Sequence, residues 1–379
     1  MPIGKIKSVL RDKKDHYVIT LYKDFRIKHN IKINNILLLS LNGKEFIRRP
    51  NSDFHLTIPK KIAGIKSKKI KLNVLKVWEM DLAKARNKLE IKNGLINNIG
   101  SLTPLKTIFN NDIYCLDSGD NLYIWYSVGG GANYVKIKKC INLERLAELV
   151  GFYFGDGNTS DGIRSFRINN CEPSALNYSL KILNEMGIGK ESMKCQIIFS
   201  TPNESLDNET IDRCVNFWSK TLGIRKKQIV SVSRSKGKTE SLKYGSARLF
   251  LDNCSLVELI VNGVLPTFVD LIKDPKTMGD KIILKGFLRG LAAAEGSVTL
   301  TKLNSLSKVG FSYDPHSNDL EFYKKILSNI GINYGGTHGN ELLIYGMKNF
   351  KIFMNLDLFK MHQTRDKKFK LGYKNHKFS

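Results

Sequence analysis

The sequence contains no uninterrupted apolar run long enough to cross a membrane, and residues 1–5 lack the apolar stretch of a secretory signal. A membrane-spanning helix needs about 18 or more such residues. No Cys-x-x-Cys pair is present either, which argues against a zinc knuckle and against a disulfide framework. We expect a cytoplasmic protein with buried free thiols. The six cysteines are widely spaced: Cys115, Cys140, Cys171, Cys195, Cys214 and Cys254.

The two ends also lack the residues of a self-splicing intein. The chain begins with Met1 where an intein has a nucleophilic Cys or Ser, and it ends in Lys377-Phe378-Ser379 where an intein has His-Asn. We therefore expect a free-standing protein.

Acidic residues are scarce relative to basic ones: 35 Asp and Glu stand against 61 Lys and Arg, a formal charge of +26. Such a charge repels itself unless a polyanion or counterions compensate it, so nucleic acid is the expected partner. A Lys-rich surface produced by a biased genome is the alternative, since Ile and Asn are abundant too. An anionic membrane fits less well, because the basic residues are spread along the chain.

The length of 379 residues exceeds what one ordinary core accommodates, and the pattern changes near residue 141. Before it lie short strand-like segments at 17–21, 36–41, 69–78, 121–127 and 134–140. After it, helices and strands alternate, and a similar order starts again near Lys281. We predict a β-rich accessory domain over 1–140 and two related units over 141–280 and 281–379.

A weak repeat lies within the first of these domains. Residues 18–25 align with residues 55–62, and residues 31–38 align with residues 65–72. Both copies resemble the swapped-hairpin DNA-binding unit of AbrB-type regulators, in which a "TIPK"-like strand and a helical turn precede "IK" and a second strand. The second copy keeps Thr57-Ile58-Pro59-Lys60. Two joined copies would form one pseudo-dimeric module; two unrelated hairpins are the alternative.

Two nine-residue segments carry the chemistry. Residues 149–157 read LVGFYFGDG and residues 288–296 read LRGLAAAEG, and their acids, Asp156 and Glu295, lie 139 positions apart. Each segment continues a helical pattern and ends in a glycine suited to a helix C-terminus. Small residues four positions apart stack on one helix face, so two backbones can approach closely. The predicted helix interface consists of Gly151, Gly155, Gly290 and Ala294.

If these faces meet with the helices parallel, Asp156 and Glu295 lie side by side. Two carboxylates at two negative helix ends repel each other, so a positive group must compensate them. A hard divalent cation with oxygen ligands, Mg²⁺ or Mn²⁺, would do so and could polarise a phosphate and activate water.

The paired segments, with the elements around them, resemble the double-motif LAGLIDADG family over most of residues 143–375. The resemblance implies an α+β fold of two pseudo-symmetric αββαββα units whose strands form a saddle on the DNA major groove. It also implies metal-dependent DNA cleavage, as in intron homing, with Asp156 and Glu295 catalytic. The implied metal site comprises these two acids with the adjacent Gly155 and Ala294.

Some positions depart from the family pattern. Phe154 and Ala293 replace the first Asp of the motif, and no accessory lysine is evident in the first unit. By order in the fold, the possible accessory residues are Asn170, His316, Lys360 and His362. A basic run near the C-terminus, which includes Arg365, is expected to face phosphate or solvent.

Basic residues on predicted strands are expected to contact DNA, because alternation places such side chains on one sheet face. They are Arg164, Arg167, Arg234, Lys236, Lys238, Lys243 and Arg248. We predict a monomer that acts as a pseudo-dimer on double-stranded DNA, with no membrane and no small-molecule substrate. A non-cleaving DNA-binding regulator and an intron RNA maturase are the alternatives.

Overall fold

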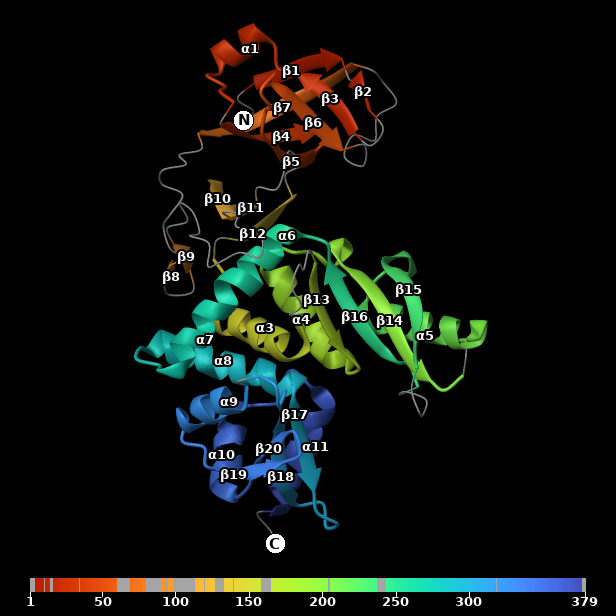
Figure 1. The fold of residues 1–379 in the computed structure, drawn as a ribbon, viewed down its shortest axis with the longest axis vertical. Coiled ribbons are helices and arrows are strands. Elements are labelled where there is room, and N and C mark those ends of the chain that lie inside the picture. The colour runs from red at the N-terminus through yellow and green to blue at the C-terminus, as the bar shows by residue number, and fades with distance from the viewer. Residues whose placement is uncertain are drawn as a thin grey trace. The chain divides into compact units, whose positions relative to one another are not determined.

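The computed structural model describes the chain except at residues 1–3, 10, 14–15, 34, 60–68, 80–89, 93–94, 98–112, 119, 127–132, 139, 158–164, 204, 237–242, 318 and 377–379. Residues 1–90 and 98–135 form one compact unit, and residues 91–97 with 136–379 form the other (Figure 1). Helices and strands are mixed in the chain, which confirms the predicted α+β class. The division at 140 and 280 stays a prediction.

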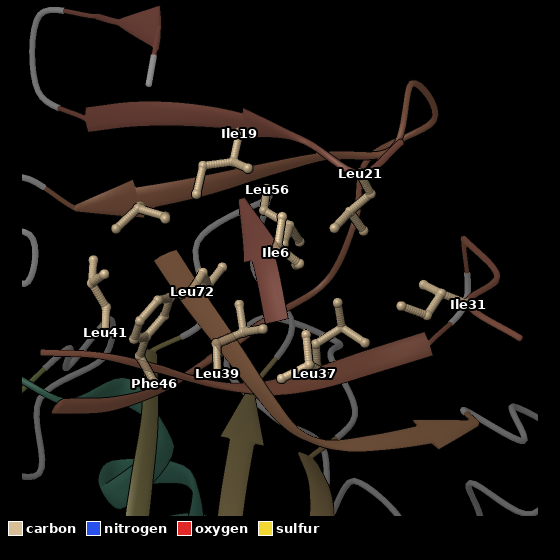
Figure 2. Close-up of a cluster of buried hydrophobic side chains, with 12 residues drawn as sticks. Ile6, Ile19, Leu21, Ile31, Leu37, Leu39, Leu41, Phe46, Leu56 and Leu72 are labelled. Carbon is tan, nitrogen blue, oxygen red and sulfur yellow. The ribbon is translucent and has the colours of Figure 1, made fainter. Parts of the chain in front are cut away.

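The first unit is built from strands around a main apolar core, and it has a second, smaller cluster that consists of Ile36, Leu38, Ile47 and Tyr123. Its described elements are β1 (Gly4–Val9), β2 (Arg11–Asp12), β3 (His16–Thr20), α1 (Lys23–Lys28), β4 (Asn35–Leu41), β5 (Lys44–Arg48), β6 (His55–Pro59), β7 (Lys69–Glu79), β10 (Ile113–Ser118) and β11 (Asn121–Tyr126). The sheets have the orders β1-β7-β4-β5, β2-β3-β6 and β10-β11-β12, the last of which includes β12 (Asn133–Lys138). Figure 2 shows the core, which includes Ile19, Leu39, Phe46 and Leu56.

Equivalent strands of the sequence repeat pair with each other in this unit. Strand β3 pairs antiparallel with β6, and Ile19 lies opposite Leu56, its own counterpart in the repeat. Strand β4 likewise pairs antiparallel with β7. Each copy therefore contributes one strand of both pairs. Helix α1 belongs to the first copy, whereas its counterpart in the second copy, 60–68, lies outside the described residues.

The second unit contains two halves, each with a motif helix and a four-stranded sheet. After the short pair β8 (Glu90–Lys92) and β9 (Leu95–Asn97), the first half comprises α3 (Leu143–Asp156), β13 (Phe166–Asn170), α4 (Pro173–Glu185), β14 (Lys194–Thr201), α5 (Asn208–Leu222), β15 (Ile229–Lys236) and β16 (Ser246–Leu251). The second half comprises α8 (Met278–Ala294), β17 (Gly296–Leu300), β18 (Leu306–Ser312), α9 (Asp319–Ser328), β19 (Tyr334–His338), β20 (Glu341–Ile344), α10 (Met347–Leu356) and α11 (Gln363–His376).

The second half follows the predicted αββαββα order, with the sheet β17-β18-β20-β19. The first half departs from it. Its sheet is β13-β16-β14-β15, and α5 with β15 is inserted between β14 and β16. Strand β15 runs parallel to β14, which requires the crossover helix that α5 provides.

One helical stretch, Cys254–Lys273, connects the halves and includes a π-helical turn at Glu258–Val264. By length and composition it could cross a membrane, but 56% of its 18-residue apolar window is buried inside the protein. Buried core helices of soluble proteins can have the same length and composition, so this feature alone does not identify a membrane-spanning helix.

The thiols differ in part from the expectation. Among the five cysteines whose side chains the structure describes, Cys195 and Cys214 are buried, whereas Cys140 and Cys171 are exposed. The prediction of uniformly buried thiols was therefore wrong for two of them, which lie just outside a helix or strand.

Candidate metal and DNA-binding site

Helices α3 and α8 lie in main-chain contact along their length. An added Cβ on any of several glycines would lie closer than 3.0 Å to the facing helix. The contacts pair Gly286 with Glu144, Gly290 with Glu148, Gly151 with Phe287, and Gly155 with Ala294. From Glu144 to Gly155 the partners advance from Gly286 to Ala294, so the two helices run parallel. The absence of side chains at these glycines is what allows the approach.

The parallel packing brings the two motif acids together. A Cβ on Gly155 would lie 2.9 Å from Cγ of Glu295, and Asp156 is the next residue of α3. Burial raises the pKa of Asp156 to about 6. Burial, followed by the charge of Asp156, raises the pKa of Glu295 to about 7. Burial is the largest cause of both shifts, so the site disfavours uncompensated negative charge on either acid.

Asn170 at the end of β13 fixes one of these acids. Its Nδ2 donates to Asp156 Oδ2 at 2.6 Å, while its Oδ1 accepts from the main-chain N–H of Glu172 at 2.7 Å. The side chain is only 8% exposed, so the protein fixes the orientation of both its Nδ2 and its Oδ1 atoms. Asn170 is the one predicted accessory residue for which a direct bond to the acid pair is observed.

Arg365 supplies positive charge beside the pair, a role that the sequence did not reveal. Its Nη1 donates to the main-chain oxygens of Ala292, Ala293 and Ala294 at 3.0, 2.7 and 3.2 Å. The guanidinium therefore caps the negative end of α8. Its charge lowers the pKa of both Asp156 and Glu295, against the larger effect of burial.

The donor set fits a hard divalent cation in type. Both side chains are carboxylates, and the helix ends add main-chain oxygens, which are the ligands that Mg²⁺ and Mn²⁺ prefer. Within the described residues, His, Cys, Asp and Glu side chains form no group of three or more that could hold a metal. A cation at Asp156 and Glu295 would thus keep several water ligands, as Mg²⁺ commonly does. The carbonyl of Ala294, a predicted ligand, already accepts from Arg365.

Three other predicted accessory residues lie elsewhere. His316 is in an exposed turn, where its N–H donates to Asp314. His362 lies 3.9 Å from Glu172 and accepts from the main-chain N–H of Arg365. Lys360 bonds to Glu148, eight residues before Asp156 on α3 and therefore about 12 Å away along the helix axis.

Glu148 is the centre of a buried ionic cluster that the sequence did not predict. Its carboxylate is fully buried and contacts Lys360 at 2.5 Å, Arg289 at 3.1 Å and Arg145 at 3.3 Å. Tyr178 donates to it at 3.0 Å. These groups come from both halves of the unit, so the cluster holds the halves together. The helical pattern of the sequence does not indicate that Glu148, on the buried face of α3, has three cationic partners.

The outer face of the first sheet carries a polar row. Arg248 donates to Gln196 at 3.4 Å, and Gln196 donates to Ser233 at 3.4 Å. Asn169 lies opposite Arg248 on the neighbouring strand, and Arg167 occupies the same face two residues earlier. Adjacent residues of these strands, including Ile168, Ile197 and Leu249, are buried on the other face. The row therefore lies on the face that the core leaves free.

The structure corrects the prediction for Arg234 and Lys236. Parallel register pairs them with Phe199 and Thr201, whose side chains lie on the buried face. Arg234 bonds to the main-chain oxygens of Thr201 and Pro202 instead of facing outward. Basic residues alternate with serines in this part of β15, so the two kinds of side chain lie on opposite faces of the sheet. Lys243 is exposed in a turn, and Arg164 and Lys238 lie outside the described residues.

The second sheet has a more mixed outer face. Ser297, Thr299 and Lys308 lie on it. Glu341 accepts from Ser297 Oγ and lies 3.8 Å from the Lys308 ammonium. The two sheets thus differ in the charge that they present.

No protein-family model matches the chain, and no curated protein matches it. Among solved structures it is similar to the N-terminal LAGLIDADG domain of DUF199/WhiA, at 13% identity over 56% of this chain and 82% of that one, with a TM-score of 0.32. Full-length DUF199/WhiA from Thermatoga maritima gives 14% identity over 60% of each chain and a TM-score of 0.34. Meganuclease I-SmaMI bound to uncleaveable DNA gives 10% identity over 62% of this chain and 93% of that one, with a TM-score of 0.28. Identities and TM-scores this low do not establish a shared function.

Proposed function

We propose that the chain binds duplex DNA through the outer faces of its two sheets and cleaves phosphodiester bonds at the Asp156–Glu295 pair with a divalent cation. One observation carries the proposal: two carboxylates meet at the ends of two parallel helices that each lead into a sheet. Such a pair is unfavourable without a cation. The formal charge of +26 makes a polyanion the natural partner.

The chain's own residues prepare this site. Asn170 fixes the Asp156 carboxylate, and both acids are only partly buried, so a hydrated cation can reach them. Arg365 favours the ionised form of the pair and offers positive charge to a phosphate beside it. A bound Mg²⁺ or Mn²⁺ would supply polarisation of that phosphate and activation of water. Asp156 and Glu295 would hold the cation.

A second candidate is a DNA-binding regulator that does not cleave. The position of Arg365 favours it, because the guanidinium already engages the Ala294 carbonyl and partly compensates the acids. In this case the acid pair would be structural, and a divalent cation would have no role. The maturase alternative has no comparable observation in its favour.

Selection of bound duplexes from a random library, followed by incubation of the enriched duplex with Mg²⁺, tests the proposal. The endonuclease should enrich one sequence and then break both strands of it. Enrichment without breakage would support the regulator instead. Failure to enrich any duplex at about 50 mM salt, where charge-driven binding is strong, would contradict both candidates.

A further inference from the structure

The first sheet contains a strand that the second sheet lacks. In each half, a helix is followed by two strands that pair antiparallel with each other: α9 precedes β19 and β20 in the second half, and α4 precedes β14 and β16 in the first. Strands β19 and β20 are joined directly by a turn. Between β14 and β16 the chain instead forms α5 and β15, and β15 becomes the edge of the sheet (Figure 1). The insertion therefore gives the first sheet an edge strand that has no counterpart in the second sheet, although each sheet has four described strands.

The inserted strand continues the polar outer face. Ser231, Ser233 and Ser235 lie in register with Gln196, Ile198 and Ser200 of β14. Ser231 and Ser235 are exposed. Hydrogen bonds from Arg248 to Gln196 and from Gln196 to Ser233 connect β16, β14 and β15 across the face. Three hydroxyls at alternate positions can donate to and accept from base edges or phosphate oxygens.

Charge indicates which partner this strand fits. Arg225, Lys226 and Lys227 are all exposed immediately before β15. Within residues 225–236 the described chain has no acidic side chain, so nothing in the strand repels a polyanion. A protein strand that paired with the free edge of β15 would form main-chain hydrogen bonds but would not need these side chains. Duplex DNA would instead use the basic side chains before β15 and the serine hydroxyls on it.

We infer that β15 extends the DNA-contacting surface of the first half at a sheet edge for which the second half has no counterpart. The inference rests on the proposed function and concerns only its geometry. It makes Ser231, Ser233 and Ser235 contact residues that distinguish the first half-site from the second.

The test compares two double variants of the full chain on the duplex enriched by the wild-type protein. Ser231→Glu/Ser235→Glu adds two negative charges to the outer face of β15. Asn208→Glu/Asn216→Glu adds the same charge to exposed positions of α5, a helix of the same insertion. Affinity and hydroxyl-radical footprints are measured for both at one salt concentration.

The serine variant should bind at least about tenfold more weakly and lose protection at one end of the footprint, because it places negative charge against DNA. The asparagine variant should stay within about twofold of the wild type. A serine variant with wild-type affinity and footprint would overturn the inference and leave the proposed function intact. A wild-type chain that enriches no duplex would overturn the proposed function as well.

Discussion

At the scale of single residues, compensation of buried charge explains most of what the candidate site contains. Asp156 and Glu295 are close together and their pKa values are raised, while Asn170 and Arg365 reduce the cost of their charge. Glu148, on the same helix as Asp156, has three cationic partners. The two sites use one helix pair in different ways: one acid is fully compensated by the protein, and the acid pair is not.

Replacing Glu148 with Ala should destabilise the protein by about 3 kcal/mol, because it removes the buried carboxylate that Lys360, Arg289 and Arg145 share and leaves each of the two arginines with one carboxylate. Urea unfolding measures the change. Glu185→Ala is the matched control, since Glu185 also pairs with Arg145 but its side chain is 40% exposed. The control should cost about 1 kcal/mol or less. Equal losses in the two variants would contradict the buried cluster.

His362 should make stability depend on pH. Burial, and then the charge of Arg365, lower its pKa to about 4 in the folded protein, against about 6.5 when unfolded. As the pH falls from about 6.5 to 4, the unfolded chain binds the proton first, so stability is lost in this window. Unfolding free energies at pH 7 and pH 5 should therefore differ more in the wild type than in His362→Gln. An identical difference in both would exclude the histidine as the cause.

At the scale of helices and strands, main-chain contact between α3 and α8 decides where the acids lie. Gly290 has no room for a Cβ, because main-chain atoms of Glu148 and Phe152 face it. Gly290→Ala should destabilise the protein by about 1–3 kcal/mol despite the better helix propensity of Ala. Gly279→Ala in the same helix is the control, since its nearest neighbour would be Thr277 Oγ1 at 3.5 Å. A Gly290→Ala protein that melts like the control would contradict the close packing.

The sequence predicted these helices well because small residues recurred four positions apart in two similar segments. Strands 17–21, 36–41 and 69–78 were also placed within a residue or two of β3, β4 and β7. Strand faces were harder to predict. In residues 233–236, serines alternate with basic residues, and only the register with β14 shows that the serines face outward. The contact of Arg365 with the end of α8 was not predicted, because Arg365 lies on a helix about 70 residues later in the chain. A local sequence pattern does not show which distant residues come together in the fold.

At the scale of the whole molecule, the net charge of +26 should dominate binding to DNA. If about six phosphates are contacted, affinity should fall about a thousandfold between about 50 and 200 mM salt. Arg248→Ala, on the outer face, should reduce the salt slope by about one. Lys236→Ala removes the same charge from an exposed residue of the other face and should leave the slope unchanged. An affinity indifferent to salt would contradict binding through basic residues.

The central claim is that Asp156 and Glu295 serve cleavage and not DNA affinity. The most direct measurement is single-turnover cleavage of the enriched duplex in Mg²⁺ by the wild type, Asp156→Asn and Glu295→Gln, with affinities determined in parallel without metal. Both variants should lose cleavage while their affinity stays within about tenfold of the wild type, because phosphate contacts supply most of the binding free energy. Full cleavage by either variant, or no cleavage by the wild type at any Mg²⁺ concentration, would contradict the claim.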